Sequence, residues 1–363
     1  MTPDVVVAGA GMAGLAAAAH ARERGAEVLH LEKAPAPGGA MRHSSGVIWR
    51  HASWEEFRRE SPDGDEALQR VLFERLDDDL DWLEARGARV TAPETGNPRT
   101  VGRRFDPASI VAALAGDIEL GAPLRELPSR ELVIGAGGPR PPRGVPVVLA
   151  TGGFAASREL LREHVTPEAD ALLLRAPAHA TGDGLRLGLA EGGRTSAGMG
   201  EIYGRAMPAA ALAPERWITD AQLYARHATV TDEVGERYEA RTWSETDVVQ
   251  WLARRPGARG WLVVPPAALG ERTPYGSVAE QIARAEAAGA EVRRAGTGTV
   301  SVHVAAAVTT TLGGLATDAS GRAAEGVWAA GADAGGIAAG GYASGLASAL
   351  VMGRIAAEAA LAG

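Results

Sequence analysis

A short apolar run near the N-terminus leads directly into a cluster of glycines. Val5-Val6-Val7-Ala8 has no polar position, which predicts a strand buried on both faces of a parallel sheet. An alanine-rich segment follows and predicts a helix, after which Val28-Leu29-His30-Leu31 predicts a second strand that ends at Glu32. Strand, glycine turn, helix and strand in this order predict a βαβ unit.

The glycines of this unit have the spacing of a dinucleotide-binding turn. In Gly9-Ala10-Gly11-Met12-Ala13-Gly14 the first glycine permits a tight turn, the second lets the backbone approach a pyrophosphate, and the third lets helix and strand pack closely. The helix N-terminus offers unpaired N–H groups to phosphates. Glu32 is expected to accept hydrogen bonds from a ribose diol. We therefore predict that the chain binds a dinucleotide.

The alternation of apolar runs and glycine turns continues along the chain. It recurs in Val147-Val148-Leu149-Ala150-Thr151-Gly152-Gly153-Phe154, in Thr181-Gly182-Asp183-Gly184 before a helical pattern, in Gly326-Val327-Trp328-Ala329-Ala330-Gly331-Ala332-Asp333, and in Gly340-Gly341-Tyr342-Ala343-Ser344-Gly345-Leu346 before an apolar helix. Strands that alternate with helices predict an α/β fold with a doubly wound, Rossmann-like parallel sheet.

The composition changes between residues 199 and 300. Trp217, Trp243, Trp251 and Trp261 all lie in this segment, and prolines interrupt it repeatedly. We expect this aromatic-rich middle part to form a smaller domain of its own, while residues 1–198 and 301–363 form the two parts of the dinucleotide-binding domain.

Composition and charge exclude several classes of protein. The chain has 363 residues, a net charge of −8 and no cysteine. Disulfides, iron–sulfur clusters and thiolate zinc sites are therefore excluded, and redox chemistry requires a bound organic cofactor. No basic run appears, so no nucleic-acid partner is expected. We expect no metal site, and the acidic run Asp77-Asp78-Asp79 is expected on a charged helix face whose apolar stripe includes Leu80 and Leu83.

The apolar segment from Val5 to Ala19 imitates a signal peptide, but Asp4 precedes it and glycines interrupt it. No other run is expected to be long enough to span a bilayer. The expectation is a soluble cytoplasmic protein without a membrane partner.

The residues after Glu32 favour a flavin over a nicotinamide. Gly38 and Gly39 allow an extended loop to lie against a cofactor, and the small hydroxyl residues Ser44 and Ser45 can bond phosphate or flavin polar atoms. A nicotinamide dehydrogenase does not need this second loop, whereas a permanently enclosed FAD does.

With these motifs in this order, the chain resembles the flavoprotein-subunit family of fumarate reductase and succinate dehydrogenase. That family also includes the ketosteroid 1-dehydrogenases and tricarballylate dehydrogenase. The stretch Thr311-Leu312-Gly313-Gly314-Leu315 resembles the point where the family's chain returns to the FAD domain. The resemblance implies non-covalent FAD, an inserted α+β capping domain over residues 199–300, and hydride transfer at flavin N5 to or from a C–C bond.

The predicted cofactor-binding residues come from the glycine turns, the ends of the strands and the second loop. They are Gly9, Gly11, Met12, Ala13, Gly14, Glu32, Lys33, Gly38, Gly39, Ser44, Ser45, Gly46, Ala150, Thr151, Gly152, Asp183, Gly331, Asp333, Ser344, Gly345 and Leu346.

The chain departs from the fumarate-reducing members of the family at two places. Thr310 stands where they have the histidine of a His-Thr-x-Gly-Gly motif, and the C-terminal glycine loop has Gly340-Gly341-Tyr342 where they have an Asn-Arg pair. The loop is more similar to that of the tricarballylate and ketosteroid dehydrogenases. Desaturation next to a carbonyl or carboxylate needs a base, a hydride acceptor and donors for an enolate-like charge.

Two tyrosines and two arginines are the predicted catalytic residues. Tyr342 and Tyr203 are candidates for donor or base, and Arg205 and Arg226 are candidate partners of a carboxylate or enolate. The predicted function is desaturation, or the reverse reduction, of a small molecule with an activated C–C bond, with an unknown electron acceptor or donor. An NAD(P)-linked reductase and a flavin-binding protein without independent turnover remain alternatives.

Overall fold

The computed structural model describes residues 2–126, 133–134, 144–211, 213–239 and 245–363. The chain divides into two compact units. The first contains residues 1–157, 177–201 and 311–363, and the second contains residues 158–176 and 202–310.

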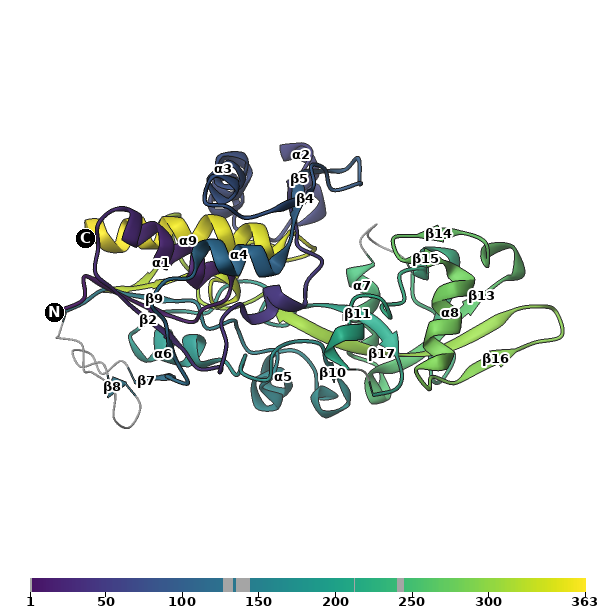
Figure 1. Cartoon of the computed structure of the whole chain (residues 1–363). Helices are drawn as coiled ribbons and strands as arrows, with labels where there is room; N and C mark the ends of the chain where they lie inside the picture. The colour runs from purple at the N-terminus through teal and green to yellow at the C-terminus, as the bar shows by residue number, and fades with distance from the viewer. Residues whose placement is uncertain (1, 127–132, 135–143, 212, 240–244) are drawn as a thin grey trace. The chain divides into compact units, whose positions relative to one another are not determined.

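A six-stranded sheet is the centre of the first unit (Figure 1). Its strand order is β18 (Arg322–Ala324), β19 (Val327–Ala329), β9 (Val147–Leu149), β1 (Val5–Ala8), β2 (Val28–Glu32) and β6 (Glu119–Leu120). Neighbouring strands from β19 to β6 are parallel, and only β18 is antiparallel to its neighbour. Because β1 and β9 are fully or almost fully buried, their apolar sequences need no polar face. The predicted parallel α/β sheet is confirmed.

Two apolar helices pack together in the first unit. They are α1 (Met12–Glu23), which follows the glycine turn, and α9 (Gly345–Ala362) near the C-terminus. Small residues allow this close packing: a Cβ atom on Gly353 would overlap the backbone of Ala13. By length and composition α9 is apolar enough to cross a membrane, so the expectation that no other run reaches that length is wrong. Just over half of α9 (56%) is buried inside the structure, as in the core helices of soluble proteins.

The long helix α3 (Glu66–Ala85) packs its apolar stripe into the core of the first unit. Leu80 and Leu83 are buried, as predicted. Asp79, however, is fully buried rather than solvated, and its carboxylate binds Arg354 of α9. Burial raises the pKa of Asp79 to about 6, although Arg354 and Arg75 act in the opposite direction. The prediction that Asp77-Asp78-Asp79 lies on a charged helix face is therefore wrong for Asp79.

A second, three-stranded antiparallel sheet belongs to the same unit, in the order β3 (Val47–His51), β5 (Thr100–Phe105) and β4 (Val90–Ala92). The remaining elements of the first unit are α2 (Trp54–Glu60), α4 (Pro107–Leu114), β7 (Leu124–Glu126), β8 (Val133–Ile134), α6 (Asp183–Ala190) and the short helices η1 (Gly39–His43) and η7 (Gly331–Asp333).

The second unit is built on a mainly antiparallel sheet. Its long central strand is β17 (Val300–Thr311), which pairs with β10 (Leu173–Leu174), β11 (Ile202–Pro208), β13 (Arg259–Val264) and β16 (Val292–Arg294), while β12 (Thr229–Asp232) pairs with β13. The other elements are α5 (Arg158–His164), α7 (Thr246–Leu252), α8 (Val278–Ala287), β14 (Arg272–Thr273), β15 (Gly276–Ser277) and the short helices η2 (Ala169–Ala171), η3 (Pro214–Arg216), η4 (Ala225–His227), η5 (Pro256–Ala258) and η6 (Pro266–Ala268).

The two units differ at their limits from the predicted domains. Residues 158–176 and 301–310 belong to the second unit, although the sequence assigned them to the dinucleotide-binding part. The physical reason is strand pairing. All of β17 except its last residue, Thr311, belongs to the second unit, and β10 pairs with β17. Of the four tryptophans of this region, Trp217 and Trp261 are buried, and Trp243 lies outside the described residues.

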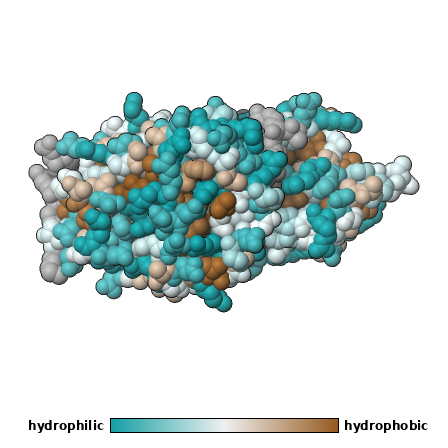
Figure 2. Space-filling model, turned by 90° about the horizontal axis from the view of Figure 1, so that it is seen from above, coloured by the Kyte–Doolittle hydropathy of each residue, from teal (hydrophilic) through white to brown (hydrophobic). Residues whose placement is uncertain are grey.

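Hydrophilic residues cover most of the face shown in Figure 2, with hydrophobic residues in small groups between them. Among the described residues, the large hydrophobic side chains that are exposed are Val101, Leu120, Leu189 and Val234. Most of the other large apolar residues therefore contribute to the cores of the units.

Candidate functional site

The glycine turn between β1 and α1 has no room for side chains at two of its positions. Gly9 has a φ of 105°, and a Cβ atom there would overlap the carbonyl of Ala150 on β9. A Cβ atom on Gly14 would overlap the carbonyl of Gly9. By contrast, a Cβ atom on Gly11 would have no heavy atom within 4 Å. The turn therefore leaves open space at Gly11, where α1 begins.

The N-terminus of α1 is available for a phosphate group. Gly11 is its N-cap, and no side chain caps it. The first helical residues, Met12 and Ala13, are buried. Unpaired N–H groups and the positive end of the helix dipole favour an anion at such a position. The turn thus fits the pyrophosphate of FAD.

Glu32 is held in a fixed position at the end of β2. One carboxylate oxygen accepts a hydrogen bond from Ala10 N and the other from Ala34 N, each at 2.6 Å. The side chain is buried. Each oxygen keeps a second lone pair for a further donor. Glu32 therefore fits the role of acceptor for the hydroxyl groups of a ribose.

The loop after β2 lies against the glycine turn. A Cβ atom on Gly39 would approach the Cα of Gly11 to 3.2 Å, so the two backbones are close. Gly38 and Gly46 have positive φ angles of 112° and 71°, which only glycine adopts readily. Ser44 accepts a hydrogen bond from Gly46 N at 3.1 Å, while Ser45 is exposed. The loop thus brings the backbone of Gly39 beside the N-terminus of α1.

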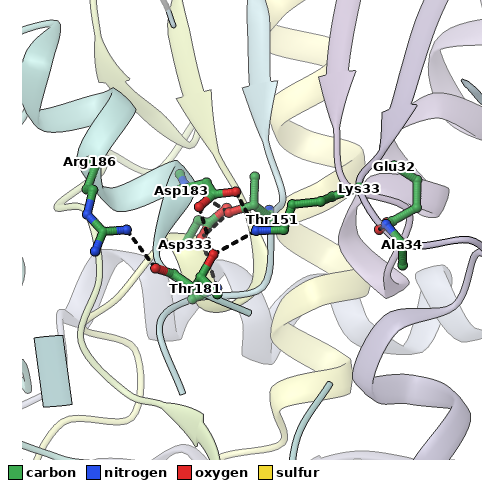
Figure 3. A network of polar contacts seen from close by, with 10 residues as sticks. Glu32, Lys33, Ala34, Thr151, Thr181, Asp183, Arg186 and Asp333 are labelled. Carbon is green, nitrogen blue, oxygen red and sulfur yellow. Dashed lines mark hydrogen bonds and ion pairs between the residues drawn. The ribbon is translucent and has the colours of Figure 1, made fainter. Parts of the chain in front are cut away.

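Asp333 is a fully buried carboxylate that joins two chain segments (Figure 3). It accepts hydrogen bonds from the backbone and hydroxyl of Thr151 and from Gly153 N, the latter at 3.0 Å. Burial raises the pKa of Asp333, and these hydrogen bonds oppose the shift. Gly184 must be glycine here, because a Cβ atom would overlap the Asp333 carboxylate. Asp333 therefore fixes the turn after β9 against the start of α6.

Lys33 and Asp183 form a second polar link in the same view (Figure 3). Lys33 Nζ lies 2.7 Å from both Asp183 Oδ2 and Thr181 Oγ1, and Thr181 donates to Asp183 Oδ1 at 2.8 Å. Arg186 donates to the carbonyl of Thr181. Both Lys33 and Asp183 were predicted to bind the cofactor, and the structure pairs them with each other.

The remaining predicted cofactor residues belong to the same unit. Gly331 has a φ of 65° and lies against Ala13, so that a Cβ atom would be 3.0 Å from the alanine side chain. Ser344 caps α9 by accepting from Ala347 N at 3.3 Å. Ala150, Gly152, Gly345 and Leu346 lie at the turn after β9 and in the first turn of α9.

The predicted catalytic residues are divided between the two units. Tyr342 lies in the first unit, with its ring 5.6 Å from that of Trp49. Tyr203, Arg205 and Arg226 lie in the second unit. The guanidinium carbon of Arg205 lies 5.1 Å from the centre of the Tyr203 ring, so the structure brings these two together.

Arg226 pairs with a residue that the sequence did not single out. Its Nε lies 3.3 Å from Oε1 of Glu245, and its own side chain is 60% exposed. Glu245 has a φ of 57°, which is rare for a residue with a side chain. No sequence signal indicates this pair, because the two residues are far apart in the chain and the φ angle depends on the fold.

Two family models match the chain. One is described as FAD dependent oxidoreductase and covers residues 4–100, and the other is described as FAD binding domain and covers residues 144–348. The second model spans more than half of the chain. The chain belongs to this FAD-binding family, and FAD is its cofactor, as the sequence predicted. The resemblance to fumarate reductase-type flavoproteins is likewise confirmed.

Curated relatives include two fumarate-reducing enzymes. A fumarate reductase (cytochrome) of Shewanella frigidimarina is 28% identical over 232 residues, which cover 53% of this chain and 40% of the relative. An NADH:fumarate oxidoreductase of Klebsiella pneumoniae is 29% identical over 236 residues, which cover 55% of this chain and 25% of the relative. The match thus covers less than half the length of either relative.

Solved structures share the fold over nearly the whole chain. The open conformation of a flavocytochrome c3 fumarate reductase has a TM-score of 0.72 at 20% identity, covering 99% of this chain and 78% of that one. A 3-ketosteroid Δ1-dehydrogenase from Sterolibacterium denitrificans has a TM-score of 0.72 at 17% identity and covers 99% of both chains. These likenesses confirm the fold.

Proposed function

We propose that the chain is an FAD-dependent oxidoreductase that desaturates, or in reverse reduces, a C–C bond next to a carbonyl or carboxylate. The observation that carries the proposal is the match of the FAD binding domain family over residues 144–348, together with a glycine turn open at Gly11. The relatives support the type of reaction, because fumarate reductases and ketosteroid dehydrogenases are named among them and both act on C–C bonds.

FAD, when bound, supplies the two-electron redox chemistry. In the proposed arrangement the turn Gly9–Gly14 and the N-terminus of α1 hold the pyrophosphate, and Glu32 holds a ribose. The second loop, the turn after β9 and the start of α9 surround the remainder. Asp333 supports this site by fixing the Thr151 turn, which follows from its three hydrogen bonds.

For the proton transfer we propose Tyr342 and Tyr203 as donor or base. Arg205 and Arg226 are proposed to bind the carboxylate or stabilise the enolate-like charge of a small-molecule substrate. The stacking of Arg205 on Tyr203 keeps its charge beside a phenol, and the largely exposed Arg226 retains donors beyond its contact with Glu245. The electron acceptor is proposed to be a separate molecule, and the location is proposed to be cytoplasmic.

The absorption spectrum of the purified protein tests the cofactor first. We expect flavin bands that move into the supernatant after heat or acid precipitation, because the FAD is proposed to be non-covalent. Anaerobic addition of candidate substrates should then bleach the bands with saturated carbonyl or carboxylate compounds, or restore them in the reduced protein with unsaturated ones. A colourless protein that binds NADH and not FAD would contradict the proposal.

A further inference from the structure

The glycine loop between η7 and α9, residues 335–344, is held in place by the segment that runs from β3 to α3. Asp65 N donates to Gly336 O at 2.9 Å. A Cβ atom on Gly341 would overlap the carbonyl of Glu60, so the loop backbone lies directly on the end of α2. On its other side, Gly340 N donates to Glu201 Oε2 at 2.9 Å.

Gln69 on α3 contributes a side-chain anchor to this loop. Its Nε2 donates to Ile337 O at 2.8 Å and to Ser61 O at 2.9 Å. Its Oε1 accepts from Arg58. The Gln69 side chain is fully buried and does not contact water. Both N–H groups of its amide donate to backbone carbonyls. Because the donors and the acceptor of this buried amide all have hydrogen-bond partners, the amide holds the Ile337 carbonyl in a fixed position.

His51 at the end of β3 contributes the second side-chain anchor. Its Nε2 lies 3.2 Å from Tyr342 O, and a carbonyl can only accept, so Nε2 carries the hydrogen. The buried ring packs against Trp49 and Phe57, with centroid distances of 5.2 and 5.0 Å. Its Nδ1 has no hydrogen-bond partner among the described residues. Phenylalanine would pack equally well against these aromatic rings. The hydrogen bond to the Tyr342 carbonyl is therefore what distinguishes a histidine at this position from a phenylalanine.

The anchored carbonyl lies close in sequence to the start of α9. Tyr342 is followed by Ala343, by the N-cap Ser344 and by Gly345, the first residue of the helix. A change at the Tyr342 carbonyl is therefore transmitted through very few rotatable bonds to the N–H groups of this helix terminus.

We propose that His51 and Gln69 are positioning residues that hold the glycine loop and the start of α9 against the flavin. This inference rests on the proposed function, in which that loop faces the cofactor. N–H groups and the positive end of a helix stabilise negative charge, so their correct placement favours the reduced flavin. Neither residue touches the cofactor; both act through the backbone of the loop.

The test is the flavin midpoint potential of the holoprotein, measured by dye equilibration. His51→Phe keeps the aromatic packing and loses the N–H. The His51→Phe variant should have a midpoint potential lower than that of the wild type by ~30 mV. For a two-electron couple this corresponds to a roughly tenfold lower ratio of reduced to oxidised flavin at a fixed potential. His51→Gln, whose amide reaches the position of Nε2, should restore the wild-type value. Gln69→Leu should shift the ratio in the same direction as His51→Phe.

His20→Phe is the matched control, because His20 is also buried and has no hydrogen-bond partner on either ring nitrogen among the described residues. It should leave the potential unchanged. If His51→Phe does not fold, His51→Asn replaces it, since its shorter amide does not reach Tyr342 O. An unchanged potential in His51→Phe and Gln69→Leu, or a shift in His20→Phe equal to that in His51→Phe, would overturn the inference. A wild-type protein without FAD would instead overturn the proposed function itself.

Discussion

Tyr342 combines a backbone role with a proposed chemical one. Its carbonyl is bound by His51 and its ring packs on Trp49, while its phenol is proposed to donate or accept a proton. Tyr342→Phe keeps the ring and the backbone contacts. We therefore expect the variant to bind FAD as the wild type does and to reduce its flavin with substrate about tenfold more slowly or worse, the usual loss when acid–base catalysis is removed.

Stopped-flow measurement of flavin bleaching in a single turnover gives this rate directly. Tyr275→Phe, in the second unit and outside the predicted site, is the control and should react at the wild-type rate. An unchanged rate in Tyr342→Phe would remove this residue from the proposed catalytic set while leaving the assignment of the cofactor untouched.

At the scale of elements, a histidine on β2 ties that strand to the glycine turn after β1. His30 Nε2 donates to Gly9 O at 2.9 Å, and the ring is fully enclosed. Burial lowers the pKa of His30 to about 4. Between pH 4 and 6.5 the unfolded chain therefore binds a proton at this residue that the folded protein does not, so the contribution of His30 to stability rises with pH across this window. The raised pKa of Asp79 acts in the opposite direction below about pH 6, so the effect of His30 is measured as the difference between the wild type and a His30 variant.

The contribution of His30 is on the order of 2 kcal/mol between pH 7 and pH 5, from 1.36 kcal/mol per pKa unit. Urea unfolding of the holoprotein at pH 5 and pH 7 measures it. His30→Gln should have a flatter dependence on pH, although it is less stable at pH 7. The exposed His179, changed to Gln, is the control and should follow the wild type. A pH dependence of stability in His30→Gln that equals that of the wild type would contradict a buried neutral His30.

At the scale of the whole molecule, the cofactor is expected to contribute measurably to stability. A ligand that binds only the folded state at a hundred times its dissociation constant adds about 2.7 kcal/mol. For a chain of 363 residues, an unfolding entropy of about 2.1 cal/mol/K per residue gives roughly 1.3 °C per kcal/mol, so the thermal midpoint should rise by about 3–4 °C.

Thermal unfolding followed by circular dichroism, with the apoprotein alone and with added FAD or NADH, tests this expectation. FAD should raise the midpoint, and NADH should not. Glu32→Ala should reduce the rise, because it removes the acceptor proposed for the ribose. A larger rise with NADH than with FAD would favour the nicotinamide alternative.

The sequence by itself determined the class of fold and of cofactor. The strands β1, β2 and β9, the helix after the glycine turn and the parallel direction of the strands follow from local patterns, because apolar runs and glycines constrain the backbone wherever they occur. FAD followed from the same motifs taken together with the family resemblance.

Only the tertiary structure decided which polar groups meet. Asp79 with Arg354, Lys33 with Asp183, and His51 with the Tyr342 carbonyl are each joined across long stretches of chain. No local pattern marks such partners, since burial and pairing depend on elements that approach each other after folding. For the same reason β17 and its partner β10 set a unit boundary that composition placed elsewhere.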